Sequence, residues 1–231
     1  MSKAFFTSAI ILAAGVGSRM RSNMTKQKMK IGSKSVLYRA VSAFESAETI
    51  DEIVVVCRKE EIDFAKAELA GISKIKAIVV GGKSRRGSAE CGFSAISEQS
   101  EFVAIHDAAR CLVSPTLIGR VADAAYFHLA ASAVSPVTDT VKRIDREGMI
   151  VDTVSRDTLR FAQTPQIFER NLYAHALSAS KKADVTDDNM MVELTGAPIF
   201  AVENEEYNFK ITTKKDIEYA EFLLQKGDIN E

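Results

Sequence analysis

The sequence is poor in cysteine and histidine, the side chains that form disulfides and hold most structural zinc ions. Its 231 residues include three of each. Cys57, Cys91 and Cys111 are odd in number and scattered, so they indicate neither a disulfide framework nor a CxxC metal site. The three histidines are equally scattered and form no ligand cluster. Catalysis through zinc or through a Cys–His nucleophile therefore has no support in the sequence.

The sequence also lacks a long hydrophobic run. No apolar stretch approaches the roughly 20 residues that a transmembrane helix needs, and residues 1–15 lead into a glycine loop instead of a cleavage site. The hydrophobic content of 46% and the charged content of 26% are ordinary for a soluble globular protein. We therefore expect a cytoplasmic protein with no membrane partner, folded as a single domain over residues 1–231.

Acidic residues are missing from the first 44 positions. This segment holds eight Lys or Arg and no Asp or Glu, which leaves 22 of the 30 bases and all 31 acids to the rest of the chain. Positive charge is thus concentrated locally in a protein whose formal net charge is −1. The densest part of the segment contains Arg19, Arg21, Lys26, Lys28 and Lys30.

These basic residues follow a loop of small residues. The loop comes after a short apolar run at residues 10–12, which is typical of a strand covered on both faces. Small residues then remove side-chain bulk where the strand ends, so backbone N–H groups can approach an anion closely. They are Ala13, Ala14, Gly15 and Gly17. We therefore predict a polyphosphate site at this loop.

Other interpretations of the loop fit the residues less well. A Rossmann dinucleotide fingerprint needs a third glycine near Met20 and an acidic residue about 20 positions later, and the acid-free segment supplies neither. A P-loop needs the string G-x-x-x-x-G-K-[ST], which is absent. A solvated basic loop without function is the remaining alternative. We expect no nucleic-acid partner, because the basic run lacks interleaved aromatic residues and the whole chain is not basic.

Helical and strand patterns alternate along most of the chain. Helices are predicted for residues 35–47, 59–69, 88–97, 115–127, 170–180, 186–194 and 213–224, and strands for residues 10–12, 52–57, 75–80, 102–106, 131–137 and 199–202. This alternation indicates an α/β fold, with a Rossmann-like, mostly parallel sheet covered by helices on both faces. Ser114, Thr186 and Thr213 are the predicted N-caps of three helices.

Residues 138–160 depart from this alternation. They are predicted to form two short strands around a Glu147-Gly148 turn, as a β-hairpin arm that protrudes from the sheet. The exposed edges of such a hairpin need to be covered. We therefore expect a homodimer in which a second subunit covers the arm.

Polar clusters follow two of the predicted strands, at the ends where open α/β sheets bind ligands. The third strand is followed by Gly81, Gly82, Arg85 and Ser88. Ser88 either faces a ligand or caps the next helix. Asp107 follows the fourth strand and faces the predicted polyphosphate loop, where its carboxylate is well placed to hold Mg²⁺. A role in a turn or cap is the alternative for Asp107.

Several strings carry a family resemblance. The loop resembles the AAG-x-G-x-R-M signature, with a later lysine, of the nucleotidyltransferases that activate sugar phosphates. The other strings are GG-x-x-R-x-x-S at residues 81–88, HDAAR at 106–110, R-x-x-L-x-x-x-QTPQ-x-F at 156–168 and N-x-K-[IV]-T at 208–212. Together they resemble the 2-C-methyl-D-erythritol 4-phosphate cytidylyltransferase family of non-mevalonate isoprenoid biosynthesis. Ribitol-5-phosphate cytidylyltransferases share most of these strings and are the near alternative.

The resemblance implies an enzyme that transfers CMP from CTP to a sugar-alcohol phosphate and releases pyrophosphate, with Mg²⁺ or another divalent cation as cofactor. It implies catalytic roles for Arg19, Lys26 and Lys210, of which the two lysines would flank the α-phosphate. The implied nucleotide-binding residues are Ala13, Ala14, Gly15, Gly17, Gly82, Arg85 and Ser88, with Gly82 and Ser88 at the cytosine. The implied acceptor-binding residues are Asp107, Arg110, Thr140 and Arg156, with Asp107 also the metal ligand.

Three residues depart from the family pattern. Thr25 stands where a proline usually precedes the loop lysine, and we expect a more flexible loop from that change. Cys111 replaces the proline after HDAAR. Tyr207 replaces the aspartate before Asn208 and so removes a possible second carboxylate near the metal. A nucleotide-binding regulatory protein without turnover is therefore the alternative outside the enzymes.

Overall fold

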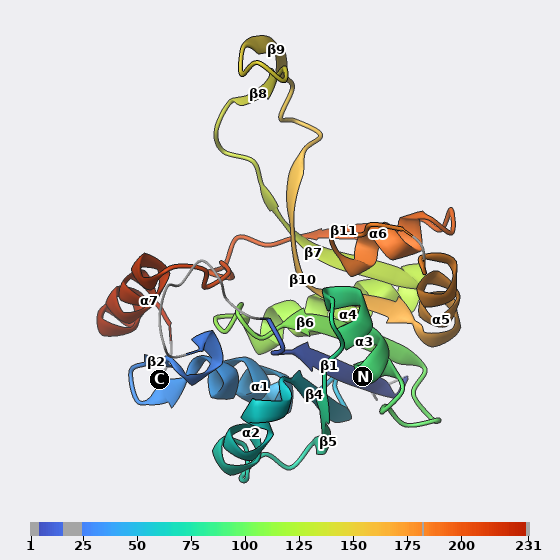
Figure 1. Ribbon diagram of the computed structural model, residues 1–231, viewed down its shortest axis with the longest axis vertical. Helices are drawn as coiled ribbons and strands as arrows, with labels where there is room; N and C mark the ends of the chain where they lie inside the picture. The colour runs from blue at the N-terminus through green and yellow to red at the C-terminus, as the bar shows by residue number, and fades with distance from the viewer. Residues whose placement is uncertain (1–4, 16–24, 182, 230–231) are drawn as a thin grey trace.

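A seven-stranded sheet forms the centre of the molecule (Figure 1). The computed structural model describes residues 5–15, 25–181 and 183–229. In spatial order the strands are β11 (Phe200–Glu203), β7 (Ala130–Pro136), β10 (Arg160–Glu169), β6 (Phe102–Asp107), β1 (Thr7–Leu12), β4 (Glu52–Cys57) and β5 (Ile75–Val80). Neighbours are parallel except that β10 runs antiparallel to both β6 and β7. The predicted α/β fold with a mostly parallel sheet is confirmed.

Helices cover both faces of this sheet, as predicted. One face packs against α1 (Val36–Ser46), α2 (Ile62–Glu68) and α4 (Pro115–His128), and the other against α3 (Arg85–Phe93), α5 (Arg170–Ala179) and α6 (Asp188–Glu193). Helix α7 (Lys214–Lys226) adds Ala220 to the first core and packs beside β2 (Lys30–Ile31), outside the central sheet. The strands alternate between two cores: in β1, Ala9 and Ile11 face the first and Ile10 the second. None of the described helices is long and apolar enough to cross a membrane.

Strand β10 is the main element that the sequence analysis did not predict. It contains Pro165, which follows a cis peptide bond and argues against a central strand because proline donates no ladder hydrogen bond. The register with β7 shifts between Ala162 and Gln166, and Pro165 lies inside that irregular stretch. A bulge is one of the places where a sheet tolerates proline. The short hairpin of β2 (Lys30–Ile31) and β3 (Lys34–Ser35) was also not predicted.

Two predicted helix starts were wrong. Helix α3 begins at Arg85 with Ser84 as its N-cap, whose side chain accepts from the backbone N–H of Gly87, so Ser88 lies inside the helix and does not cap it. Helix α6 is capped by Asp187, one position after the predicted Thr186. In both cases the cap is the polar residue whose backbone is extended, which composition alone does not reveal. The predicted caps at Ser114 and Thr213 are confirmed.

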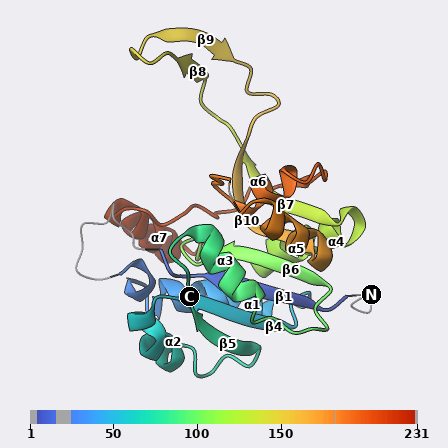
Figure 2. The same cartoon turned by 45° about the vertical axis from the view of Figure 1, so that its right-hand side comes forward.

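The predicted β-hairpin arm is present and projects from the sheet in both views (Figures 1 and 2). Its strands are β8 (Val141–Ile144) and β9 (Ile150–Val154), which pair only with each other among the described residues. Gly148 adopts a φ of +88° in the connecting turn, a value that favours glycine. Large apolar side chains on the arm are 60–67% exposed: Ile144, Met149, Ile150 and Val151.

Candidate active site

A cavity of about 480 Å³ lies where β1, β4, β5 and β6 reach their carboxyl ends. Most of the sequence-predicted site residues that the structure describes line it: Ala14, Gly15, Lys26, Gly82, Arg85, Ser88, Asp107 and Lys210. They come from the ends of β1, β5 and β6, from the short helix η2 (Lys26–Lys28), from α3 and from the segment before α7. Parallel strands deliver the loops that follow them to one edge of the sheet. Gly17 and Arg19 lie outside the described residues.

Glycine residues let the loops around the cavity approach closely. A Cβ at Gly81 would lie 2.7 Å from the Cβ of Ala14 and 2.9 Å from Ser88 Oγ. A Cβ at Gly82 would lie 2.7 Å from the carbonyl carbon of Gly87. At Gly15, by contrast, a Cβ would meet no atom of the described residues within 4 Å. The two glycines that follow β5 therefore allow close packing, and both Gly82 and Gly15 line the cavity.

Hydrogen bonds fix two of the predicted residues, Ala13 at the start of the loop and Ser88 in the cavity wall. Ala13 is fully buried, and its N–H donates to the carbonyl of Val56 at 2.7 Å, which ties the start of the loop to β4. The Ser88 hydroxyl donates to the carbonyl of Ser84 at 2.9 Å, within the first turn of α3. Its oxygen therefore remains able to accept a hydrogen bond from a ligand.

Asp107 lies between two cations. Its carboxylate accepts from Lys210 Nζ at 2.6 Å and from Arg85 Nε at 3.3 Å. Burial alone would raise the pKa of Asp107, but the charges of Arg85 and Lys210 outweigh it and hold the pKa well below its usual range. Asp107 is consequently ionised at neutral pH.

Asp188 is a buried residue that the sequence analysis missed. Its carboxylate pairs with Arg85 Nη1 and accepts from the hydroxyl of Tyr173 at 2.6 Å, so it fixes the guanidinium beside Asp107. The Gln166 side chain holds α6 in place by accepting from the N–H groups of Asp188 and Asn189 at 3.1 and 3.2 Å. The only sequence signal was the helix start at residues 186–188, whose acids were assigned to capping.

The two predicted catalytic lysines are brought together. Lys26 Nζ donates to the carbonyl of Ile211 at 3.2 Å, next in sequence to Lys210. The N–H of Ile211 in turn donates to the carbonyl of Ala109 at 2.7 Å, which ties this segment to the loop after Asp107. Both ammonium groups therefore border the same end of the cavity.

The predicted acceptor-binding residues are not brought together within one chain. Arg110 donates to the carbonyls of Asn208 and Ala162 at 2.8 and 3.2 Å, and its Nε is buried without a partner. Thr140 and Arg156 flank the two strands of the arm and do not line the cavity. The guanidinium of Arg156 donates to the carbonyl of Thr138, within the arm itself.

His106 is fully buried beneath Asp107 and serves the scaffold. Its Nδ1 lies 3.0 Å from the Thr164 hydroxyl and its Nε2 lies 3.2 Å from the carbonyl of Arg110. The same hydroxyl accepts from the N–H of Asp107 at 3.1 Å. Burial lowers the pKa of His106 to about 3, so the imidazole is neutral. It joins β6 to the QTPQ segment of β10.

Two cations on the cavity were not predicted. Arg58 follows β4 directly, and Lys83 follows Gly82. The signal that could have found them is the rule already applied to Asp107, that side chains just after the carboxyl ends of parallel strands share one edge. The Thr25 hydroxyl donates to the buried carboxylate of Glu61, a hydrogen bond that the sequence analysis did not predict.

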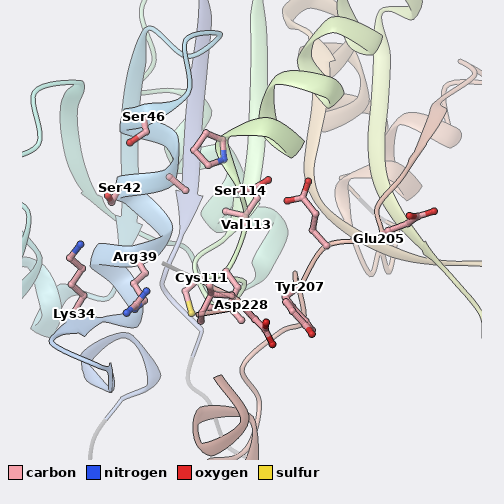
Figure 3. A pocket seen from close by; sticks show the side chains of 15 residues that line it. Lys34, Arg39, Ser42, Ser46, Cys111, Val113, Ser114, Glu205, Tyr207 and Asp228 are labelled. Atoms are coloured by element: carbon pink, nitrogen blue, oxygen red, sulfur yellow. The ribbon is translucent and has the colours of Figure 1, made fainter. Parts of the chain in front are cut away.

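A second cavity, of about 650 Å³, shares no lining residue with the first (Figure 3). Lys34 and Arg39 lie on one side and Tyr207 and Asp228 on the other, with Cys111 between them. Burial raises the pKa of Cys111 to about 12, so its thiol stays protonated. Cys111 and Tyr207, two of the departures from the family pattern, thus line this cavity and not the one that holds Asp107.

Comparison with known proteins decides the family. The family model for 2-C-methyl-D-erythritol 4-phosphate cytidylyltransferase matches residues 7–226. The chain belongs to this family. A relative of that name from Caldanaerobacter subterraneus subsp. tengcongensis is 39% identical over 224 residues, covering 95% of this chain and 99% of the relative. Another from Clostridium botulinum is 38% identical, covering 95% and 97%.

Solved structures of family members have the same fold. The 4-diphosphocytidyl-2C-methyl-D-erythritol synthase of Anaerococcus prevotii superimposes with a TM-score of 0.86 at 33% identity, covering 96% of each chain. The 2-C-methyl-D-erythritol 4-phosphate cytidylyltransferase of Thermus thermophilus gives a TM-score of 0.76 at 30% identity, covering 96% of this chain and all of that one. The resemblance found in the strings therefore extends to the whole architecture.

Proposed function

We propose that this family member transfers CMP from CTP to 2-C-methyl-D-erythritol 4-phosphate and releases pyrophosphate. The observation that carries the proposal is the charge of the cavity. Asp107 is the single carboxylate among the described residues that line it, against five cations: Lys26, Arg58, Lys83, Arg85 and Lys210. Such an excess of positive charge suits a triphosphate and a second phosphate.

The chemistry needs no protein nucleophile. An oxygen of the acceptor's phosphate attacks the α-phosphorus of CTP, a new P–O bond forms, and the bond to the β-phosphate breaks as pyrophosphate leaves. Because both reactants are anions, the enzyme must hold them together and stabilise the charge that develops. Lys26 and Lys210, which border one end of the cavity, are the residues we propose for the α-phosphate.

The nucleotide would occupy the remaining wall of the cavity. Gly82 and Ser88 are the residues that we propose for the cytosine, and Arg85 stands behind them with its charge directed to Asp107. For the phosphates we propose backbone N–H groups of the loop that begins at Ala14 and Gly15, which line the cavity. The roles of Gly17 and Arg19 rest on the family resemblance alone.

Mg²⁺ fits this site only together with the nucleotide. No group of three His, Cys, Asp or Glu that could hold a metal occurs among residues 5–15, 25–181 and 183–229. Mg²⁺ typically takes one or two carboxylates, substrate phosphates and water. We propose Asp107 as the protein ligand, which requires the ion pair with Lys210 to loosen. When bound, the ion neutralises phosphate charge, and full turnover in excess EDTA would contradict this part.

We propose a homodimer with shared sites. A two-stranded hairpin is marginally stable in water by itself, and this one carries exposed apolar side chains. A second copy of the chain would cover the arm, and would receive Thr140 and Arg156 at its own cavity. Arg110 would then bind the acceptor together with the two arm residues.

A pyrophosphate-release assay tests the activity. CTP is supplied with either 2-C-methyl-D-erythritol 4-phosphate or ribitol 5-phosphate, and kcat/KM is compared. The proposal expects the methylerythritol compound to be the better acceptor. Preference for ribitol 5-phosphate would show that the chain catalyses the ribitol-5-phosphate cytidylyltransferase reaction instead. CTP binding without turnover on either acceptor would favour a regulatory protein.

A further inference from the structure

Arg58 is placed to contact the phosphates of a bound nucleotide. It is the first residue after β4 and lines the cavity beside Lys26 and Lys83. Its side chain keeps 23% of its surface exposed, which leaves the guanidinium within reach of a ligand in the cavity. None of the strings that carry the family resemblance includes this residue.

The guanidinium is held from one side by a buried carboxylate. Arg58 Nε donates to Glu61 Oε2 at 3.1 Å, and Nη2 lies 3.0 Å from Glu61 Oε1. The Glu61 side chain is 3% exposed, so this bidentate pair has a fixed geometry. The remaining Nη1 pairs at 3.0 Å with Glu60, whose side chain is 65% exposed. Exposed ion pairs are weak, so a polyphosphate can replace Glu60 while Glu61 keeps its hold.

Glu61 also joins Arg58 to the segment that carries Lys26. The hydroxyl of Thr25, the residue before Lys26, donates to Glu61 Oε1. Thr25 is itself fixed at the start of the short helix η2 (Lys26–Lys28), since its carbonyl accepts from the N–H of Lys28 at 3.0 Å. One carboxylate therefore sets the positions of both Arg58 and the segment that carries Lys26.

We propose that Arg58 binds the phosphate chain of the nucleoside triphosphate, and that Glu61 and Thr25 orient it for that contact. The inference rests on the proposed use of CTP. It adds to the reaction a phosphate-binding arginine and a positioning threonine. Arg58 contributes to affinity for the phosphates, whereas Thr25 acts through Glu61 and Arg58.

The first test compares Arg58→Gln with Lys59→Gln, which removes an exposed charge one position away and outside the cavity. Calorimetry measures the Kd of CTP, CMP and inorganic triphosphate. Arg58→Gln should raise the Kd of CTP and of triphosphate about tenfold, as loss of one charge-assisted contact does. It should raise the Kd of CMP less than about twofold. Lys59→Gln should change all three by less than about twofold.

The outcomes separate the inference from the proposed function. Wild-type protein that fails to bind CTP contradicts both. Wild-type binding with equal affinities for the two variants contradicts only the role of Arg58. An equal loss for CMP and CTP in Arg58→Gln also overturns it, since the contact would then not be made to the β- or γ-phosphate.

A second test isolates the role of Thr25. Thr25→Val removes the hydroxyl and should raise the Kd of CTP about threefold to fivefold. Thr25→Ser keeps the hydroxyl, and its Kd should stay within about twofold of the wild-type value. In the Arg58→Gln background, Thr25→Val should add less than about twofold, because its effect passes through Arg58. Fully additive losses would overturn the positioning role. Thermal unfolding of each variant shows that it is folded.

Discussion

At the scale of single residues, the charges around Asp107 determine its protonation state. One carboxylate faces Lys210 and Arg85 and stays ionised, while His106 next to it stays neutral because it is buried. The sequence analysis found Asp107 and Lys210 through strand ends and the family strings. It missed Asp188, because a buried partner for an arginine leaves no periodic signal, and the contact spans 103 positions.

Replacing Lys26 tests its catalytic role. Lys26→Ala should lower kcat by at least about 100-fold, which is typical for removal of one group that stabilises developing charge. Lys30→Ala is the matched control, because this exposed lysine of the same basic segment does not line the cavity. Steady-state kinetics with CTP and the acceptor decides the question. A change confined to KM would remove Lys26 from the catalytic set.

The buried histidine predicts a pH dependence of stability. Burial lowers the pKa of His106 from its ordinary value of 6.5 to about 3 in the folded protein. Between these values the unfolded chain binds the extra proton, so stability is fully present above pH 6.5 and is lost as the pH falls. From pH 7 to pH 5 this amounts to about 2 kcal/mol. Denaturant titrations at both pH values measure the free energy of unfolding. Between pH 7 and pH 5, the wild type should lose about 2 kcal/mol more of it than His106→Asn does. Equal losses would contradict the neutral imidazole.

At the scale of elements, the strands with continuous apolar runs were predictable and β10 was not. Residues 52–57 and 75–80 were predicted with the bounds that β4 and β5 have. The strand β10 has a different pattern, because its first half leads into the arm and Pro165 interrupts it. Its direction, antiparallel to both neighbours, follows from the hairpin before it, which returns the chain to the sheet.

Helix α3 owes its close approach to the sheet to Gly92. A Cβ there would lie 2.4 Å from Ile10 Cγ2 and 2.9 Å from Val56 Cγ2, so Gly92→Ala must displace the helix that carries Arg85 and Ser88. We expect a loss of about 1–3 kcal/mol in unfolding free energy. Gly119→Ala in α4 is the control, because no atom in the described part of the chain lies within 4 Å of its added Cβ. It should stabilise by about 0.5–1 kcal/mol. Unfolding titrations that rank the two variants the other way would contradict this packing.

At the scale of the whole molecule, the arm separates residues that the sequence analysis assigned to one site. Thr140 and Arg156 flank the two strands of the projecting hairpin, whereas Lys26 lines the cavity. The sequence predicted the arm from its turn and short strands. It left open which subunit supplies each acceptor-binding residue, because in the proposed homodimer this depends on how the second chain packs.

Mixed dimers test the shared site. In a dimer of Lys26→Ala with Arg156→Ala, one site collects both changes and the other collects neither. Random reassortment of equal amounts makes about half of the dimers mixed, so activity should recover to roughly a quarter of wild type. Mass spectrometry of differently tagged chains confirms the exchange. Complete exchange without recovered activity would mean that both residues serve their own subunit's site.

The most direct measurement of the central claim is a ³¹P NMR spectrum of the reaction with CTP and 2-C-methyl-D-erythritol 4-phosphate. Transfer of CMP predicts that the triphosphate and phosphomonoester signals disappear together. A pyrophosphate signal and the paired signals of a new phosphoanhydride should replace them in equal amounts. With Lys26→Ala under the same conditions, the signals of the two substrates should remain. Release of CMP and pyrophosphate with the 2-C-methyl-D-erythritol 4-phosphate signal unchanged would show that the protein hydrolyses CTP, and would contradict the account.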